Sequence, residues 1–454
     1  MRKQNHRQSD REPHGDSAAD SLKSSEPSGS EWSRRDFVKA AAVTAAAGSV
    51  LGSSAWAAGS DVLKVGLIGC GGRGTGAAFN SLEASERIHI AALADLFPDR
   101  LSSSRSSLQG HAPDRATVPD SQCYIGFDAY KNLIRDSGVD IVILATPPHF
   151  RSIQFEEAVR AGKHVFMEKP VATDPVGIRR VIANGEIAKS KGLSVVAGTQ
   201  RRHEKSYLVA MKKIEEGLIG EVISARVYWN QGGLWVKEHQ PEWSDMEWQI
   251  RNWLYFTWAS GDHIVEQHVH NIDVSNWVMG GPPVRCLGMG GRQSRTEAKY
   301  GNIFDHFAIE FEYPNGQFTL SMCRQADGAA GRVQEVIHGS KGTMILRPGF
   351  AVAQSHAKES DLLWRYRDPD PSPYVLEHVD LIDSISNNKG LNEAKRVAES
   401  TLSAIMGRMS AYTGQAVTWE QALNSKLDLA PESGYEFTDL SVRPVAIPGT
   451  TPLI

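Results

Sequence analysis

Short apolar runs alternate with segments of helical spacing through the first half of the chain, from residue 62 to about 198. Five of these runs are predicted to be strands: Val62–Ile68, Ile88–Ala94, Ile141–Ala145, His164–Met167 and Val195–Ala197. The segments between them are predicted to be helices: Thr75–Ser85, Asp128–Ser137, Phe150–Ala161 and Pro175–Lys191. Strands that alternate with helices in this way indicate a doubly wound parallel sheet.

The pattern changes after Glu221, where apolar and polar residues alternate as in antiparallel strands. A Pro-Asn-Gly sequence at 314–316 indicates a hairpin turn between two of them. The expected strands are Val222–Trp229, Asp305–Tyr313, Gln317–Met322, Gln334–His338 and Thr343–Leu346, with helices at Tyr207–Glu216, Ile264–Val278 and Asn392–Tyr412. We therefore predict an α/β protein: a doubly wound parallel sheet at residues 58–198, then an α+β domain with a mainly antiparallel open sheet at residues 199–454.

Composition argues against binding to nucleic acid, a zinc site, a disulfide framework and a membrane span. The chain has 454 residues, of which 41% are hydrophobic and 22% charged, as in ordinary globular proteins. Its formal net charge of −4 gives no basic surplus for nucleic acid. The four cysteines form no C-x-x-C pair, so neither a zinc site nor a disulfide framework is expected. No segment approaches the roughly 20 apolar residues of a membrane span.

The first 57 residues have the pattern of an export leader. Residues 1–32 are polar and expected to be disordered. Ser33-Arg34-Arg35-Asp36-Phe37-Val38-Lys39 then precedes a mildly apolar stretch that ends in Ala55-Trp56-Ala57. This order resembles a twin-arginine signal with cleavage after Ala57, although a chance basic helix is the alternative. We therefore expect export of the folded protein to the periplasm.

A glycine-rich turn follows the first predicted strand. Gly69, Gly71 and Gly74 have the G-x-G-x-x-G spacing, and Asp95 ends the second strand. In a dinucleotide site the glycines allow a tight turn, close approach of the diphosphate and packing of the next helix. A carboxylate at the end of the second strand accepts hydrogen bonds from the adenosine ribose. Together these residues predict a Rossmann fold that binds NAD in preference to NADP; the glycines alone could form an ordinary turn.

Two later strands end in residues suited to a ligand site. Ile141–Ala145 is followed by Thr146-Pro147-Pro148-His149, and His164–Met167 by Glu168-Lys169-Pro170. In open α/β sheets, ligands bind outside the carboxyl ends of the strands. The prolines fix the backbone where the nicotinamide half of a cofactor would lie. Lys169 is therefore expected to face the ligand crevice, whereas an isolated surface lysine would only be solvated.

These motifs resemble those of the glucose–fructose oxidoreductase / inositol dehydrogenase (Gfo/Idh/MocA) family. The matching pieces are G-C-G-G-R-G at 69–74, Ala94-Asp95, Thr146-Pro147, G-K-H-V-F-M-E-K-P at 162–170 and G-x-Q-R-R at 198–202. The resemblance implies action on sugars or polyols, with Lys169 at the reacting hydroxyl and the nicotinamide ribose. It also implies a homo-oligomer formed through the second-domain sheet. The expected cofactor-binding residues are Gly69, Gly71, Gly72, Arg73, Gly74, Asp95, Thr146, Pro147, His149, Glu168, Lys169 and Gln200.

The other half of the site is expected within residues 261–273. Read as one helix, this stretch places Glu266, His270 and Asp273 on one face, where two carboxylates would orient His270 and raise its basicity. The family pattern D-x-G-x-H-x-x-D makes His270 the catalytic histidine, whereas Glu266 replaces an aspartate and its role stays open. A buried core histidine is the alternative for His270. We expect Lys169, His270, Glu266 and Asp273 to be catalytic. The histidine spacing is not that of a zinc site, so no metal is expected.

Substrate contacts are expected from cationic and aromatic residues. Arg251 and Trp253 could hold a sugar ring, although some of the tryptophans in this region must be core. Arg151 stands where the family often has histidine, and with Arg201 and Arg202 it would suit an anionic sugar. The expected substrate-binding residues are Lys169, Arg201, Arg251, Trp253 and His270.

Three functions are compatible with these residues. The first is an exported NAD-dependent oxidoreductase that removes a hydroxyl proton while hydride passes to the nicotinamide. The second is a glycoside-cleaving enzyme that holds NAD tightly, oxidises its substrate transiently, eliminates a group and returns the hydride. The third is a non-catalytic sugar-binding protein with a structural NAD.

Overall fold

The computed structural model describes residues 62–358 and 361–454. The predicted twin-arginine segment at 33–39 and the cleavage site after Ala57 lie outside the described residues. Within the described ranges, no helix combines the length and apolar character needed to cross a membrane.

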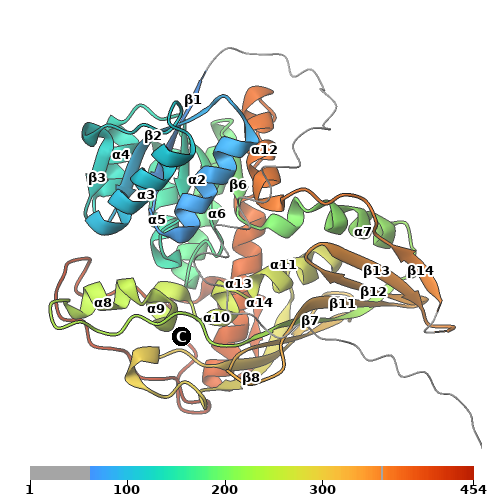
Figure 1. Cartoon of the computed structure of the whole chain (residues 1–454). Helices are drawn as coiled ribbons and strands as arrows, with labels where there is room; N and C mark the ends of the chain where they lie inside the picture. Colours follow the sequence, from blue (N-terminus) through green and yellow to red (C-terminus); the bar gives the residue numbers. More distant parts are fainter. Residues whose placement is uncertain (1–61, 359–360) are drawn as a thin grey trace, which may run out of the picture. The chain divides into compact units, whose positions relative to one another are not determined.

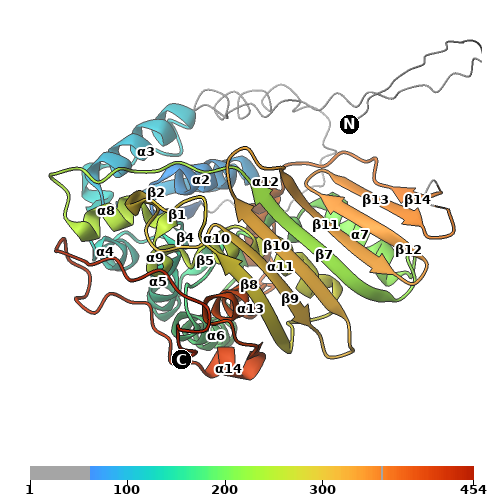
Figure 2. The same ribbon diagram turned by 90° about the horizontal axis from the view of Figure 1, so that it is seen from below.

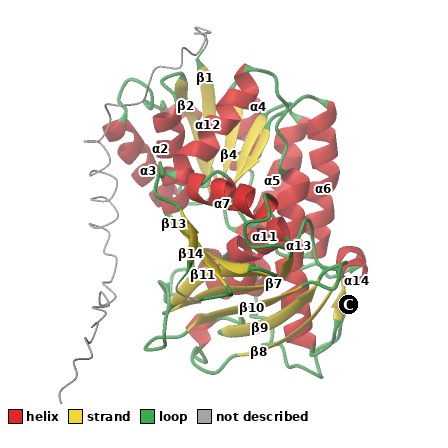
Figure 3. Cartoon of the chain, turned by 90° about the vertical axis from the view of Figure 1, so that its right-hand side faces the viewer, coloured by secondary structure: helices red, strands yellow, loops and turns green. Residues whose placement is uncertain are grey.

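The first sheet confirms the predicted doubly wound fold. Its six parallel strands run in the order β3-β2-β1-β4-β5-β6, with helices on both faces (Figure 3). The strands are β1 (Leu63–Ile68), β2 (Ile88–Asp95), β3 (Cys123–Ile125), β4 (Ile141–Leu144), β5 (His164–Met167) and β6 (Val195–Ala197). The helices are α2 (Gly72–Ala84), α3 (Pro98–His111), α4 (Ala129–Asp136), α5 (Pro148–Arg160) and α6 (Pro175–Ser190). Strand β3 and helix α3 were not predicted, because β3 has only three partly exposed residues and α3 is rich in serine.

The second sheet confirms the predicted mainly antiparallel arrangement. Its order is β14-β13-β12-β11-β7-β10-β9-β8-β15, and β7 pairs in parallel with β10. The strands are β7 (Val222–Gln231), β8 (Arg285–Gly291), β9 (His306–Glu312), β10 (Phe318–Gln325), β11 (Arg332–Gly339), β12 (Gly342–Arg347), β13 (Phe350–Ser355), β14 (Leu362–Arg365) and β15 (Val417–Thr418). Helices α7 (Lys205–Glu215), α11 (Val269–Val278) and α13 (Ala394–Thr413) pack on one face, and Figure 2 views the other.

A helix from the late part of the chain returns to the first sheet. Helix α12 (Pro373–Ser386) packs against α2 and lies beside β6 (Figure 1). Asn392, between α12 and α13, forms an isolated parallel bridge with Val195 of β6. The segment 199–454 therefore supplies a helix to the first sheet as well as the whole of the second.

The helix predicted at Ile264–Val278 is broken in two. Helix α10 (His263–Glu266) ends before α11 begins at Val269. The break follows from side chains that bind the sheet: Gln267 hydrogen-bonds Gln231 and Gln325, and His268 Nε2 lies 2.7 Å from Ser321 Oγ. Because of this break, Glu266 and His270 do not lie on one face of a single helix.

The remaining described α-helices are α8 (Asp245–Arg251), α9 (Thr257–Ser260) and α14 (Trp419–Asn424). Short 3₁₀ helices are formed by Asp120–Gln122, Gln200–Arg202, Trp253–Tyr255 and Ala298–Tyr300. Residues 425–454 after α14 form no regular element. This segment runs beside α8 and α9 in Figures 1 and 2.

Candidate active site

The glycine turn between β1 and α2 has the geometry of a dinucleotide site. Gly69 has φ +100°, and a Cβ there would lie 2.6 Å from backbone atoms of Ala145 and Thr146. A Cβ on Gly74 would lie 1.8 Å from the Gly69 oxygen, so helix and strand pack too closely for a side chain. At Gly72, by contrast, a Cβ would meet no heavy atom within 4 Å. Gly71 caps α2 without a side-chain hydrogen bond, so the first helical N–H groups are available to a diphosphate.

Asp95 lies beside this turn at the end of β2. Its carboxylate accepts hydrogen bonds from the Cys70 amide at 2.6 Å and the Phe97 amide at 2.8 Å. Burial raises the pKa of Asp95. Arg100, which was not predicted, places Nη1 3.6 Å from the Cβ position of Gly71. Its signal in the sequence is a cation in the first turn of the helix after Asp95. A carboxylate and a cation therefore flank the place of an adenosine ribose.

Lys169 follows β5 and pairs with Glu266 of α10. The Lys169 ammonium donates to the Glu266 carbonyl oxygen at 2.6 Å and lies 3.3 Å from its carboxylate. Both side chains are 13% exposed, so the pair lies mostly out of solvent. The structure thus brings two of the four predicted catalytic residues into direct contact, and His270 is close enough for the Lys169 charge to act on it. Glu266 contacts the lysine instead of the histidine.

Arg151 ties together the two loops that flank Lys169. This buried guanidinium donates to the carbonyl oxygens of Pro170 and Thr146. Thr146 Oγ1 in turn donates to Gln154 at 2.7 Å. Burial lowers the pKa of Arg151 to about 10. Arg151 therefore positions the Thr146-Pro147 and Lys169-Pro170 backbones and does not offer its charge to a ligand.

His270 is buried against Trp229, with ring centroids 5.6 Å apart. Among the described residues, its Nδ1 atom has no hydrogen-bond partner. Burial holds the pKa of His270 well below its usual value, and the charges of Lys169 and Arg201 lower it further. The expectation of a more basic histidine is therefore wrong. The imidazole is neutral and its Nδ1 is buried, so Nε2, which has no hydrogen bond to another described residue, is the nitrogen that could meet a hydroxyl ligand.

Asp273 is separated from His270 and has other partners. Its carboxylate accepts from Arg202 Nε at 2.8 Å, Arg396 Nη1 at 3.2 Å and Ser400 Oγ at 2.7 Å. These cations hold the pKa of Asp273 below its usual value despite burial. This carboxylate links α11 to α13 and does not orient the histidine as expected.

The three arginines expected to bind an anionic sugar do not form such a pocket, because each of them has a protein partner. Arg201 is buried in an ion pair with Glu335 and lies over the rings of Tyr207 and Trp229. Arg202 is bound to Asp273, and Arg151 to two backbone oxygens. Arg201 is therefore a core residue beside the site and not a free substrate ligand.

Helix α12 adds residues to the cofactor side that were not predicted. Arg73 in the glycine turn pairs with Glu168 and lies 3.2 Å from Glu377 of α12. Its guanidinium is 5.1 Å from the ring centroid of Tyr374. Gln200 Nε2 is 3.4 Å from the Tyr374 hydroxyl, and its buried Oε1 has no partner among the described residues. This orphaned oxygen, together with the open glycine turn, fits a bound dinucleotide.

Three predicted site residues lie away from Lys169. His149 is buried, with Nε2 2.7 Å from the Tyr435 hydroxyl, and burial lowers its pKa to about 4. Arg251 stacks over Phe97 at 3.8 Å and lies 3.3 Å from Asp99, both close in sequence to Asp95. Trp253 packs edge-on against Trp235. Arg251 thus belongs to the adenosine end of the site, where it was not expected.

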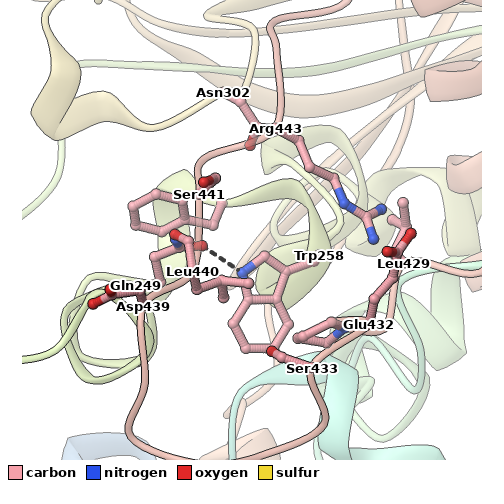
Figure 4. A pocket seen from close by; sticks show the side chains of 12 residues that line it. Gln249, Trp258, Asn302, Leu429, Glu432, Ser433, Asp439, Leu440, Ser441 and Arg443 are labelled. Carbon is pink, nitrogen blue, oxygen red and sulfur yellow. Dashed lines mark hydrogen bonds between the residues drawn. The ribbon is translucent and has the colours of Figure 1, made fainter.

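A cavity of about 330 Å³ lies under the C-terminal segment (Figure 4). The segment supplies Leu429, Pro431, Glu432, Ser433, Asp439, Leu440, Ser441 and Arg443, and the facing wall is Gln249, Phe256, Trp258 and Asn302. Lys169, Glu266 and His270 are not among its lining residues, so it is distinct from the candidate active site.

Comparisons with known proteins agree with this fold. Residues 63–199 match the oxidoreductase family with an NAD-binding Rossmann fold, and residues 207–345 match the GFO/IDH/MocA C-terminal domain. The chain therefore belongs to the Gfo/Idh/MocA family.

Individual relatives are distant. A 2,7-anhydro-N-acetylneuraminate hydratase of Escherichia coli is 28% identical over 227 residues, 49% of this chain and 55% of that protein. A glycosyl hydrolase family 109 protein of Shewanella is 28% identical over 215 residues, 43% of this chain and 45% of that protein. The chain thus spans about half the length of these curated relatives. A levoglucosan dehydrogenase solved with NADH and levoglucosan has the same fold, with TM-score 0.63 and 18% identity over 79% of this chain and 99% of that one.

Proposed function

We propose that the protein is an NAD-dependent enzyme that acts on a hydroxyl group of a sugar, sugar derivative or polyol. The observation that carries this proposal is the set of Lys169, Glu266 and His270 at the carboxyl end of β5, next to the glycine turn. A bound NAD supplies the hydride acceptor that protein side chains lack.

The three residues divide the handling of the hydroxyl group. The Lys169 ammonium, held by Glu266, donates to the substrate oxygen and stabilises the negative charge that develops on it. We assign acceptance of the hydroxyl proton to His270 Nε2, since the imidazole is neutral and no hydrogen bond joins this nitrogen to another described residue, whereas Nδ1 is buried. Glu266 fixes the lysine by two contacts and keeps its charge balanced.

NAD is the favoured dinucleotide, because the Asp95 carboxylate would repel a 2′-phosphate. The two backbone amides that hold Asp95 fix its position at the turn. Arg100, which lies beside Gly71, carries the opposite charge, so loss of Asp95 would leave a cation at this place.

A second function has specific support from the relatives. One of them is named a hydratase and another a glycosyl hydrolase, and neither name describes a net redox reaction. In this second function the same three residues would handle only protons, while the hydride would pass to bound NAD and later return from it. Oxidation to a carbonyl would make the neighbouring C–H acidic, so the leaving group would be eliminated, water would add in its place, and returned hydride would leave NAD unchanged overall. Retention of NAD also suits an exported enzyme.

One experiment separates these functions. The purified protein is denatured, its released ligand is identified by mass spectrometry, and the native protein is assayed with sugars, polyols and aryl glycosides. NADH formation on a free sugar supports a dehydrogenase, whereas aglycone release with added NAD unchanged supports the second function. NAD binding without either activity would leave only a sugar-binding protein with a structural NAD.

We also propose that the protein is exported through its twin arginines. The support is the order Arg34-Arg35, Phe37, mild apolar stretch and Ala55-Trp56-Ala57. Replacing both arginines with lysine should leave an active precursor in the cytoplasm, which cell fractionation and immunoblotting would detect. Normal export of that variant would refute the proposal.

The open face of the second sheet supports a homo-oligomer. Its exposed side chains include Leu287, Met289, Phe318 and Met322, and Met289 is 75% exposed. Met289 and Met322 both pair with Ala308 of β9, so they lie on the same face of the sheet, one on each side of this small residue. We expect Met289→Arg to shift the mass measured by light scattering from oligomer to monomer. A wild type that is already monomeric would refute this proposal.

A further inference from the structure

The C-terminal segment bridges the two halves of the described structure. Leu429 donates its amide to Asp174, the N-cap of α6, at 2.9 Å. The Tyr435 hydroxyl lies 2.7 Å from His149 of α5. Farther on, Thr438 accepts from the Met246 amide at 3.2 Å, and Leu440 donates to Asp245 at 3.1 Å. The stretch from Tyr435 to Leu440 thus has one end on the first sheet's helices and the other on α8.

Phe437 occupies the middle of this bridge and faces the carboxyl ends of β2 and β3. Its ring centroid is 6.0 Å from that of Phe97 and 5.1 Å from that of Phe127. Phe97 follows β2 and donates its amide to Asp95, and Phe127 follows β3. The Phe437 ring is 46% exposed, so one of its surfaces is open.

The neighbours of Phe437 give this end of the crevice the character of an adenosine site. Arg251 of α8 stacks on Phe97 and pairs with Asp99. These contacts join α8 of the second domain to the start of α3, the helix that follows Asp95. An aromatic face beside a ribose-binding carboxylate is a stacking surface for a purine base, which proteins use without base-specific hydrogen bonds.

We propose that residues 429–440 form a clasp over the adenosine half of the dinucleotide site and that Phe437 is a cofactor-binding residue. The inference rests on the proposed function, since it requires a bound dinucleotide. The clasp lies outside both family matches, which end at residue 345, so it is additional to the Rossmann motifs. Because its hydrogen bonds tie it to α5, α6 and α8, the clasp holds the crevice closed and slows release of the cofactor.

The test uses the full mature chain and NADH as the probe. Phe437→Ala is compared with wild type and with Ile447→Ala, a control that removes a 59% exposed apolar side chain later in the same segment. Two quantities are measured: nucleotide retained per protein after gel filtration, and the dissociation rate followed by NADH fluorescence on displacement with excess NAD. We expect Phe437→Ala to raise the dissociation rate about 10- to 100-fold, the range of one base–aromatic stack. The Ile447→Ala control should match wild type.

A second variant tests the clasp with a change too small to unfold the protein. Tyr435→Phe removes only the hydroxyl that contacts His149, and it should raise the dissociation rate in the same direction. Its melting temperature should fall slightly, because His149 loses a buried hydrogen bond, but the variant should stay folded at the assay temperature. If wild type binds NADH and both variants release it at the wild-type rate, the clasp is refuted while the proposed function stands. If wild type binds no nucleotide, the proposed function fails first, and the clasp with it.

Discussion

The ion pair between Lys169 and Glu266 determines what the candidate site can do to a hydroxyl group. Lys169→Met removes the charge at the substrate oxygen and should lower turnover by a factor on the order of 10² to 10⁴. Arginine should not restore it, because a guanidinium is larger and keeps its proton. NAD affinity should change far less, since the diphosphate is bound at the Gly69–Gly74 turn. Steady-state kinetics and NADH titration of both variants test this prediction.

Lys213→Met, at a half-buried lysine whose side chain is 36% exposed, is the control for loss of a lysine. A double variant with His270→Ala should lose less than the product of the two single losses if both residues act on one proton. Near wild-type turnover in Lys169→Met would remove the lysine from the mechanism.

The lowered pKa of His270 leads to a pH dependence of activity opposite to the one expected from the sequence. A histidine flanked by carboxylates would protonate in mildly acidic solution, and activity would fall there. In the structure burial and nearby cations lower its pKa, so protonation begins only well below pH 6.5. The profiles of kcat/KM against pH should therefore show no inflection near pH 6.5 in wild type that is missing from His270→Gln. Such an inflection near pH 6.5 would show that the ring is charged in the working site.

Asp95 is the residue at which cofactor preference can be tested. Asp95→Ala should reduce discrimination against NADP, because the carboxylate that repels a 2′-phosphate is gone while Arg100 remains. The ratio of dissociation constants for NADPH and NADH, measured by fluorescence titration, should fall toward one. Asp128→Ala, at an exposed carboxylate, is the control. Equal affinity for both nucleotides in wild type would contradict the assignment.

At the scale of elements, the sequence predicts those helices, strands and turns that depend on residues close together in the chain. Buried parallel strands such as Ile141–Leu144 are continuous apolar runs, and the glycine turn needs its glycines for steric reasons visible in the spacing. The break between α10 and α11 was not visible, because it depends on Gln267 and His268 binding strands far away in the chain. The contact between α12 and the glycine turn was hidden for the same reason.

Asp273 shows how that break changes a site prediction. Its carboxylate joins α11 to α13 through Arg202, Arg396 and Ser400, so its role is structural. Asp273→Asn should lower the free energy of unfolding by about 3 kcal/mol, as expected for breaking a buried ion pair. Turnover per folded molecule should stay within about threefold of wild type. Thermal melting and kinetics measure the two effects, with the exposed Asp136→Asn as control. A large loss of turnover at unchanged stability would show that Asp273 has a catalytic role.

At the scale of the whole molecule, the site depends on contacts between segments that no local pattern relates. Lys169 comes from the first sheet and Glu266 from the second domain, while Glu377 and Phe437 come from the part of the chain after the family matches. Lys169 and Glu266 could be assigned to the site from the sequence, because the family motifs that contain them occur in the same order along this chain. The later residues could be found only from the fold, since α12 and the C-terminal segment return to the first sheet.

Buried histidines also make the stability of the molecule depend on pH. Burial lowers the pKa of His149 to about 4 and that of His268 to about 3. The unfolded chain binds protons at these residues below pH 6.5, whereas the native protein does not until much lower pH. Stability is therefore lost as the pH falls from 6.5 toward 4, by about 1.4 kcal/mol per pH unit for each histidine. His203, whose pKa is raised to about 10 by Asp380 and Glu393, is protonated in both states there and does not offset the loss.

The melting temperature should thus fall steeply between pH 6.5 and 4.5, and a buried histidine should account for a measurable part of the slope. His268→Asn cannot take up a proton on unfolding, so its free energy of unfolding should depend less on pH by about 1.4 kcal/mol per unit. The variant should be less stable than wild type near pH 7, because the contact with Ser321 is weakened, and the difference should shrink in acid. Urea unfolding at pH 7, 6 and 5 measures this, with the exposed His111→Asn as control. A His268→Asn slope equal to that of wild type would show that His268 is already protonated in the native protein.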